Sequence, residues 1–201
     1  MLTQLTTVKA RLALDLLDPT YDALLSSAIA AFSSRFDLET NRILARTVNA
    51  QFEFPAEDSE VAVPCFPIEN VTRFECKSSE SDGWLERGQV EYLIRKGCLI
   101  SLATPFAKVR AASSVSQPVL ARVTYTGGYL LPGSAAVPGA TALPADLSQA
   151  EVEQVAFWFQ TRNELGIVRQ WPRGGDYKQL VDSDLLPSVR ETLGKYKRFT
   201  P

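Results

Sequence analysis

The spacing of apolar residues changes twice along the chain, and this order is the strongest constraint on its fold. Helical spacing, with apolar residues three and four positions apart, runs up to Asn41. Strand-like segments rich in β-branched and aromatic residues follow as far as Tyr129, and a second helical pattern begins at Pro144. Helices at both ends with a block of strands between them do not fit an all-helical chain. The sequence therefore predicts an α+β protein.

The clearest helix follows Asp18, which is a good N-cap residue, and Pro19, which suits the first helical position. Apolar residues then line one face, as expected of a helix that packs on a core: Tyr21, Leu24, Leu25, Ala28, Ile29, Phe32 and Phe36. This helix is expected to end between Leu38 and Asn41. Three other helices are predicted over about 6–16, 144–165 and 187–193.

Strand signals occupy the middle of the chain. The predicted strands are 45–54, 60–63, 68–77, 92–95, 98–102 and 119–125. Lys96-Gly97 lies between two of them and predicts a β-hairpin. The segment 131–142 contains two prolines and two glycines among small residues and is expected to be a linker or a long loop.

Composition excludes several classes of function. The net charge is −2, without the basic surface that phosphate neutralisation by a nucleic-acid binder needs. The chain has no histidine, which removes the usual general base and the commonest metal ligand. Its three cysteines lack CxxC spacing, and we expect them to be buried apolar residues. We therefore predict no enzyme activity, no catalytic residue, no cofactor and no metal.

No targeting or membrane signal is visible. The first residues lack the basic and apolar regions of a signal peptide, and no apolar run approaches the ~20 residues that cross a bilayer. We therefore expect no membrane partner, and folding in a reducing cytoplasm. The acidic cluster Glu57, Asp58 and Glu60 has no calcium-loop spacing and is interpreted as a solvated loop.

Two regions near the C-terminus are candidate partner-docking sites. Trp171 is followed closely by Arg173 in a predicted loop, where it could form an interface or cover the core locally. The second region is a cationic tail with interleaved aromatic residues, which either frays in solvent or orders on a partner. Its candidate docking residues are Arg190, Lys195, Tyr196, Lys197, Arg198 and Phe199.

Taken in order, several short motifs resemble one family. An Arg-Phe…Thr-Asn-Arg element comprises Arg35, Phe36, Thr40, Asn41 and Arg42. The later elements are Cys65-Phe66-Pro67-Ile68-Glu69-Asn70-Val71, Glu91-Tyr92 before the Gly97 hairpin, Val123-Thr124-Tyr125-Thr126-Gly127-Gly128-Tyr129, and Leu143-Pro144-Ala145-Asp146-Leu147 leading to Arg162. This set resembles the head–tail connector, or adaptor, proteins of long-tailed double-stranded DNA phages.

The resemblance implies a structural role in the virion neck, at the head–tail interface, after assembly in the host bacterial cytoplasm. Members of that family form a ring, typically of twelve copies, beneath the portal protein. The ring extends the channel through which double-stranded DNA passes without sequence-specific binding. It also joins the portal to a downstream neck (stopper) protein or tail protein.

On this interpretation the helices of 1–42 and 143–201 form a helical connector core with a C-terminal docking tail. Residues 43–130 form an inserted antiparallel β-rich lobe, and 131–142 form the linker. The alternative is an accessory virion binding module whose β lobe recognises a carbohydrate or a host surface. Exposed aromatic residues such as Trp84 would distinguish that alternative.

Overall fold

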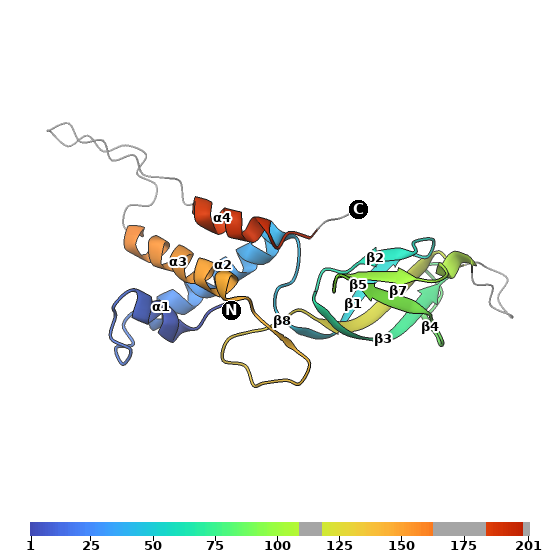
Figure 1. Ribbon diagram of the computed structural model, residues 1–201, viewed down its shortest axis with the longest axis horizontal. Helices are drawn as coiled ribbons and strands as arrows, with labels where there is room; N and C mark the ends of the chain where they lie inside the picture. The colour runs from blue at the N-terminus through green and yellow to red at the C-terminus, as the bar shows by residue number, and fades with distance from the viewer. Residues whose placement is uncertain (109–117, 163–183, 199–201) are drawn as a thin grey trace, which may run out of the picture. The chain divides into compact units, whose positions relative to one another are not determined.

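The computed structural model describes residues 1–108, 118–162 and 184–198 (Figure 1). Helices come first, antiparallel strands follow and helices return, so the predicted α+β fold is confirmed. The chain divides into two compact units. The first, called here the helical unit, comprises Met1–Thr40, Leu131–Gly133 and Leu143–Lys197. The second, the β lobe, comprises Asn41–Leu130, Ser134–Ala142 and Arg198–Pro201.

The helical unit is a bundle organised around one helix. Its elements are α1 (Leu5–Arg11), α2 (Asp22–Thr40), α3 (Ala145–Thr161) and α4 (Pro187–Gly194). α3 contacts each of the other three, and Figure 1 shows α4 lying alongside it. No helix in the described part of the chain combines the length and apolar character that crossing a bilayer requires.

The core of this bundle follows the predicted apolar stripes. It is formed by Val8, Leu25, Ala28, Ile29, Val152, Val155 and Phe159. The ring of Tyr21 packs edge-on against Phe159, with centroids 5.2 Å apart, a favourable aromatic geometry. Leu24 departs from the prediction, since 40% of its surface is exposed. The stripe is therefore narrower than its apolar composition indicates.

Helix ends differ from the sequence prediction at the α1–α2 connection. α1 ends at Arg11 rather than near Leu16, because Ala13 takes a left-handed φ of 54° that turns the chain. α2 begins at Asp22 rather than Pro19. The Asp18 carboxylate accepts the backbone N–H of Thr20 at 2.9 Å and closes a turn ahead of the helix, where an N-cap was predicted.

Lys9 holds this connection together although it is only 2% exposed. Its ammonium group donates to the carbonyls of Leu16 at 3.1 Å and Asp18 at 2.6 Å, and to the Asp22 carboxylate at 2.8 Å. All three donor positions of a lysine are thereby used. The α1–α2 loop is therefore fixed by one buried cation.

The β lobe contains two antiparallel sheets and one short parallel pair. The four-stranded sheet has the order β1 (Thr47–Pro55), β7 (Leu120–Gly127), β3 (Ile68–Lys77) and β4 (Leu85–Arg87). The three-stranded sheet has the order β2 (Glu60–Ala62), β6 (Leu99–Leu102) and β5 (Tyr92–Arg95). β8 (Tyr129–Leu130) pairs in parallel with β9 (Thr141–Ala142). The 3-10 turn η1 (Phe106–Lys108) follows β6.

One apolar cluster joins the two antiparallel sheets. Its buried members are Phe54, Ala56, Val61, Val63, Cys65, Ile68, Phe74, Ile100, Leu102, Phe106, Ala121, Val123 and Tyr125. β7 is the central strand, and Ala121, Val123 and Tyr125 on its predicted inner face are fully buried. Val119 was placed on the same face but is 67% exposed, because the strand begins after it. The interior is therefore built on β7.

Glycine is required where β7 leads into β8. Gly128 has a φ of +95°, and a Cβ there would lie 2.6 Å from the carbonyl oxygen of Ala45. Its N–H donates to the carbonyl of Pro67 at 2.9 Å. The close approach explains the glycine of the Gly127-Gly128-Tyr129 motif, because any side chain would displace backbone atoms.

Four short elements were missed from the sequence: the strands β4, β8 and β9 and the 3-10 turn η1. β4 lies in a stretch that the sequence indicated only as a turn followed by Trp84. β9 lies within 131–142, which was predicted to be a linker or a long loop. All four are very short, two or three residues, and carry too little pattern to be recognised.

Candidate partner interface

The α4 helix carries the docking candidate Arg190, the other described candidates follow its end at Gly194, and α3 positions the helix. Leu185, Val189 and Leu193 are buried. The backbone N–H of Leu186 donates to the side-chain oxygen of Gln154 on α3 at 2.8 Å. Gln154 is itself only 2% exposed, so this bond is partly shielded from water, which strengthens it. The start of α4 is thereby fixed.

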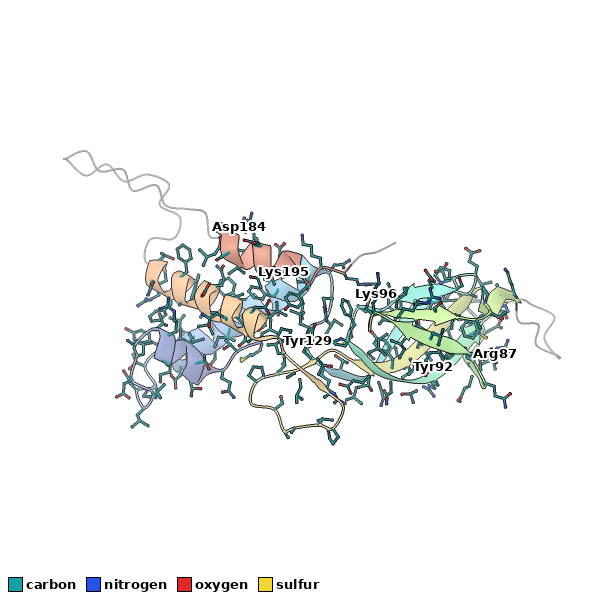
Figure 2. The ribbon with its side chains drawn as sticks, viewed as in Figure 1. Arg87, Tyr92, Lys96, Tyr129, Asp184 and Lys195 are labelled. Carbon is teal, nitrogen blue, oxygen red and sulfur yellow. The ribbon has the colours of Figure 1, made fainter. Side chains whose placement is uncertain are left out.

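A charged cluster lies where α4 meets α2. Asp184 accepts from Arg35 of α2 at 2.6 Å, and its second oxygen accepts from Arg190 of α4. Glu39 lies one helical turn after Arg35, at 3.9 Å. Figure 2 labels Asp184 beside the start of α4. One carboxylate therefore joins two helices through two arginines.

The same residues line a surface cavity of about 380 Å³. Its lining comprises Arg35, Glu39, Asp184, Arg190, Leu193 and Lys197. Three cations and two carboxylates give this cavity an excess of one positive charge. Arginine guanidinium groups bind carboxylates and phosphates in a fixed planar geometry. Asp184 already binds both arginines, so an acidic group presented by a partner would share or replace that carboxylate.

The remaining described tail residues make contacts of their own. Tyr196 donates its hydroxyl to Asp146 at the start of α3, at 2.7 Å. Arg198 donates to the carbonyl of Ala62 at 2.5 Å and stacks over the ring of Phe52. Partial burial lowers the pKa of Arg198. Lys195 is exposed in the turn that follows α4 (Figure 2).

The predicted docking residues therefore separate into groups. Arg190 and Lys197 meet at the cavity, Lys195 is exposed beside it, and Tyr196 and Arg198 are held by intramolecular bonds. The three other predicted residues, Trp171, Arg173 and Phe199, lie outside the described residues. The docking role of the set stays a prediction.

Sequence reasoning missed three members of the cavity. In the sequence Arg35 belongs only to a motif, and no site role is predicted for Glu39 or Asp184. Arg35 and Asp184 lie 149 residues apart along the chain. The only available signal was the position of Arg35 and Glu39 four residues apart, on one face of the predicted helix.

The β lobe holds Trp84, the residue that would favour carbohydrate recognition. The Arg122 guanidinium carbon lies 4.2 Å from the centroid of the Trp84 ring, and the Lys77 ammonium lies 5.1 Å from it. Arg122 is held in turn by the buried carboxylate of Glu75 at 2.8 Å. The ring is half-buried and engaged in cation–π contacts. These contacts do not favour Trp84 as an open sugar-stacking platform.

A buried cation of the lobe follows the end of α2. Arg42 is 4% exposed, lies 3.4 Å from the ring centroid of Phe66, and donates to the Phe66 carbonyl. Burial lowers the pKa of Arg42. This contact gives the Arg42 of the sequence motif a structural role. Across the described ranges, no three His, Cys, Asp or Glu side chains group as a metal site would require.

Comparison with known proteins gives matches among solved structures. One is a chain in the neck of an empty GTA particle, computed with C6 symmetry, with 15% identity and a TM-score of 0.55. That match covers 96% of this chain and 88% of the other. Another is a chain in the virion of a native gene transfer agent (GTA) particle, with 14% identity and a TM-score of 0.53. It covers 97% of this chain and 88% of the other.

These chains share a fold with the present one. The likeness extends over both the helical unit and the β lobe, since it covers nearly the whole chain. No protein-family model and no curated protein sequence matches it.

Proposed function

We propose that this chain is a structural virion protein of a phage or phage-like neck, acting as a head–tail adaptor. The observation that carries the proposal is the fold similarity to a chain of a GTA neck over 96% of the length. The ordered motifs of the sequence independently resemble the head–tail connectors of long-tailed phages. The role is one of assembly, without catalysis.

The adaptor acts as a ring in this proposal. The similar neck chain belongs to a particle computed with C6 symmetry, and the connector resemblance implies twelve copies. A ring closes through heterologous contacts between identical copies and needs no active site. The helical unit would form its core, and the β lobe would be an insertion between the helices in the sequence.

The ring would lie at the head–tail interface, between the portal protein and the downstream neck (stopper) or tail protein. It would extend the channel for double-stranded DNA. The net charge of −2 suits a wall past which DNA slides, because a strongly basic lumen would hold the phosphates. The cavity of Arg35, Arg190 and Lys197 would receive acidic groups of the portal.

Particle morphology tests the adaptor role. An amber stop in the gene should give filled, tailless heads beside free, complete tails in electron micrographs of the infected-cell lysate. A suppressor strain that restores the full-length protein is the matched control and should give joined particles. Normal joined particles under the non-permissive condition would remove the adaptor role.

Charge reversal tests the docking surface. The double change Arg190→Glu with Lys197→Glu should weaken binding to purified portal at least about tenfold, because it places acidic groups opposite an acidic partner. Lys108→Glu, an exposed change of the same sign in the β lobe, is the control and should leave binding unchanged. Equal binding by all three proteins would remove the cavity from the portal interface and leave the adaptor role to the morphology test.

A further inference from the structure

The outer strand of the three-stranded sheet is apolar and open. Every residue of β5 is exposed: Tyr92 by 37%, Leu93 by 66% and Ile94 by 38%, with Arg95 after them. β6 covers one side of β5, and no described strand covers the other. An exposed apolar edge strand is a template for pairing with another strand. This edge therefore requires a partner or a device that blocks one.

The hydrogen-bond pattern identifies which groups face the open edge. The carbonyl of Glu91 accepts from Ala103 N, at 3.0 Å, on the side of β6. Backbone groups alternate in direction along an antiparallel strand, so Leu93 and Arg95 also point towards β6. The N–H and C=O groups of Tyr92 and Ile94 therefore point to the open edge. Each of these two residues can form one hydrogen-bonded pair with a residue of another strand.

The two ends of β5 carry opposite charges. Glu91 precedes the strand, whereas Arg95 and Lys96 end it, and all three are exposed. A cavity of about 400 Å³ adjoins the acidic end, where Glu86 and Glu91 contribute to its lining. Arg87 also lines this cavity, and its guanidinium donates a hydrogen bond to the sulfur of Cys76 at 2.9 Å. In Figure 2, Lys96 lies near one end of β5, and Tyr92 and Arg87 lie near the other.

We propose that β5 pairs antiparallel with β5 of a second copy of this chain, about a two-fold axis at Leu93. In this register Tyr92 of each copy lies opposite Ile94 of the other, and their outward-facing backbone groups exchange two hydrogen bonds. Glu91 lies opposite Arg95 of the other copy, twice by symmetry. Lys96 of the other copy approaches the acidic end of the cavity. The strand is therefore complementary to itself in charge and in hydrogen bonding.

The side chains also fall on matching faces. Glu91, Leu93 and Arg95 alternate with Tyr92 and Ile94, so both ion pairs and the Leu93–Leu93 contact share one face. The Arg95 guanidinium donates to Glu60 of β2 at 3.2 Å on that face, a bond that pairing with Glu91 of the other copy would share or replace. Tyr92 packs on Phe74 of the lobe interior, with centroids 5.5 Å apart. Cross-strand pairs of opposite charge and of apolar residues stabilise strand pairing.

This pairing goes beyond the proposed function and does not rest on it. Neighbours in a cyclic ring are related by a rotation that is not two-fold, so a self-complementary contact cannot form the ring interface. The paired state would instead belong to free protein, where it covers the apolar edge. Loss of β5 pairing and loss of head–tail joining are therefore separate outcomes.

Engineered disulfide formation tests the axis directly. Leu93→Cys in a Cys98→Ser background should give a disulfide-linked dimer, because opposing residues that are not hydrogen-bonded lie about 4.5 Å apart at Cα. Val48→Cys in the same background is the control, since Val48 is similarly exposed, at 57%, on β1. Crosslinking should be at least about tenfold faster at position 93 than at position 48, because the axis alone brings two identical residues face to face. Equal rates, or preferential crosslinking between mixed Leu93→Cys and Val48→Cys proteins, would overturn the proposal.

Charge exchange supplies a second readout, by sedimentation velocity of the full chain over a wide concentration range. Glu91→Arg alone places like charges opposite one another twice and should weaken dimerisation about tenfold. Adding Arg95→Glu to that variant restores opposite charges and should restore dimerisation. A monomeric wild-type protein, or a double variant no better than the single one, would overturn the two-fold register.

Discussion

Ionisable and amide side chains lie inside the helical unit, whereas the central cluster of the β lobe is apolar and aromatic. Lys9, Glu151 and Gln154 are at most 2% exposed in the helical unit. Each joins two segments of that unit: Lys9 holds the α1–α2 loop, Glu151 accepts from Ser33 of α2 at 2.5 Å, and Gln154 accepts from the start of α4. The central cluster of the lobe consists of apolar and aromatic side chains, and the buried ionisable residues of the lobe, Arg42 and Glu75, lie outside that cluster.

This difference teaches which unit responds to which perturbation. Polar bonds between helices have specific geometry and depend on protonation, so the helical unit should be sensitive to pH and to isosteric polar changes. An apolar cluster depends on volume and close packing, so the lobe should be sensitive to truncation.

Truncation in the lobe is expected to have the largest effect. Phe74 is 3% exposed and packs against Phe106 at 5.7 Å between ring centroids. Phe74→Ala should lower the free energy of unfolding of the lobe by about 3–5 kcal/mol. Calorimetry of the full chain measures it, with the exposed Leu85→Ala on the neighbouring strand β4 as control. An unchanged unfolding profile would show that packing at Phe74 does not limit the stability of the lobe.

The buried carboxyl of the helical unit should make stability depend on pH. Burial raises the pKa of Glu151 from 4.5 to about 7, opposed by the hydrogen bond from Ser33. Between those values the folded state holds a proton that the unfolded state has lost, so rising pH removes stability. Above about pH 7 the loss approaches about 3 kcal/mol, which Glu151→Gln should recover.

Urea unfolding of the two proteins at several pH values isolates this contribution. Their difference should be small below pH 4.5 and should grow until about pH 7. Glu153→Gln, on the same helix and less buried, is the matched control and should give no such trend. A difference between wild type and Glu151→Gln that stays constant with pH would contradict the assignment.

Backbone geometry in the lobe gives a smaller effect. Gly128→Ala should cost about 2 kcal/mol, because the residue has a positive φ and its Cβ would meet the backbone of Ala45. Gly139 has a φ of +82° but open space around it, so Gly139→Ala should cost only the conformational part, about 1 kcal/mol. Thermal unfolding of the two variants separates the effect of crowding by Ala45 from the cost of a positive φ. Equal losses of stability in both variants would show that the close approach to Ala45 does not cause the loss at Gly128.

The smallest effect is expected on the surface of the helical unit. Arg190 and Asp184 are 54% and 41% exposed at the side chain, so Arg190→Ala should lower stability by no more than about 0.5 kcal/mol. Gln154→Ala, which removes the buried bond to Leu186, is the internal comparison and should cost about 1–3 kcal/mol. Chemical denaturation measures both. A larger loss of stability for Arg190→Ala would show that the charged cluster contributes to the stability of the helical unit.

Much of the fold could be predicted because it is encoded by local pattern. The apolar stripe of α2, the bounds of β3 and the end of α2 at Thr40 agree with the sequence prediction. Local pattern does not show which polar residues face inward, and the apolar stripe of α3 gave no reason to place Glu151 and Gln154 in the interior. Their burial depends on partners from α2 and α4, more than a hundred and about thirty residues away along the chain.

The candidate site was predictable only in part for the same reason. Composition identified cations near the C-terminus, and Arg190 and Lys197 do meet at a cavity. Asp184 joins Arg190 to Arg35, a pairing that only the folded chain brings together. The internal bonds of Tyr196 and Arg198 were equally invisible, because a tail with mixed aromatic and basic residues has the same composition whether it is held or free.

The position of the lobe within the chain also sets the order in which the molecule can be completed during synthesis. The last strand of the large sheet, β7, ends at Gly127, whereas α3 begins only at Ala145. A ribosome therefore releases every strand of both antiparallel sheets before it releases the helix that contacts α1, α2 and α4. The lobe can acquire its core while the apolar face of α2 still lacks α3. The earliest helices of this protein are thus among the last elements to be packed.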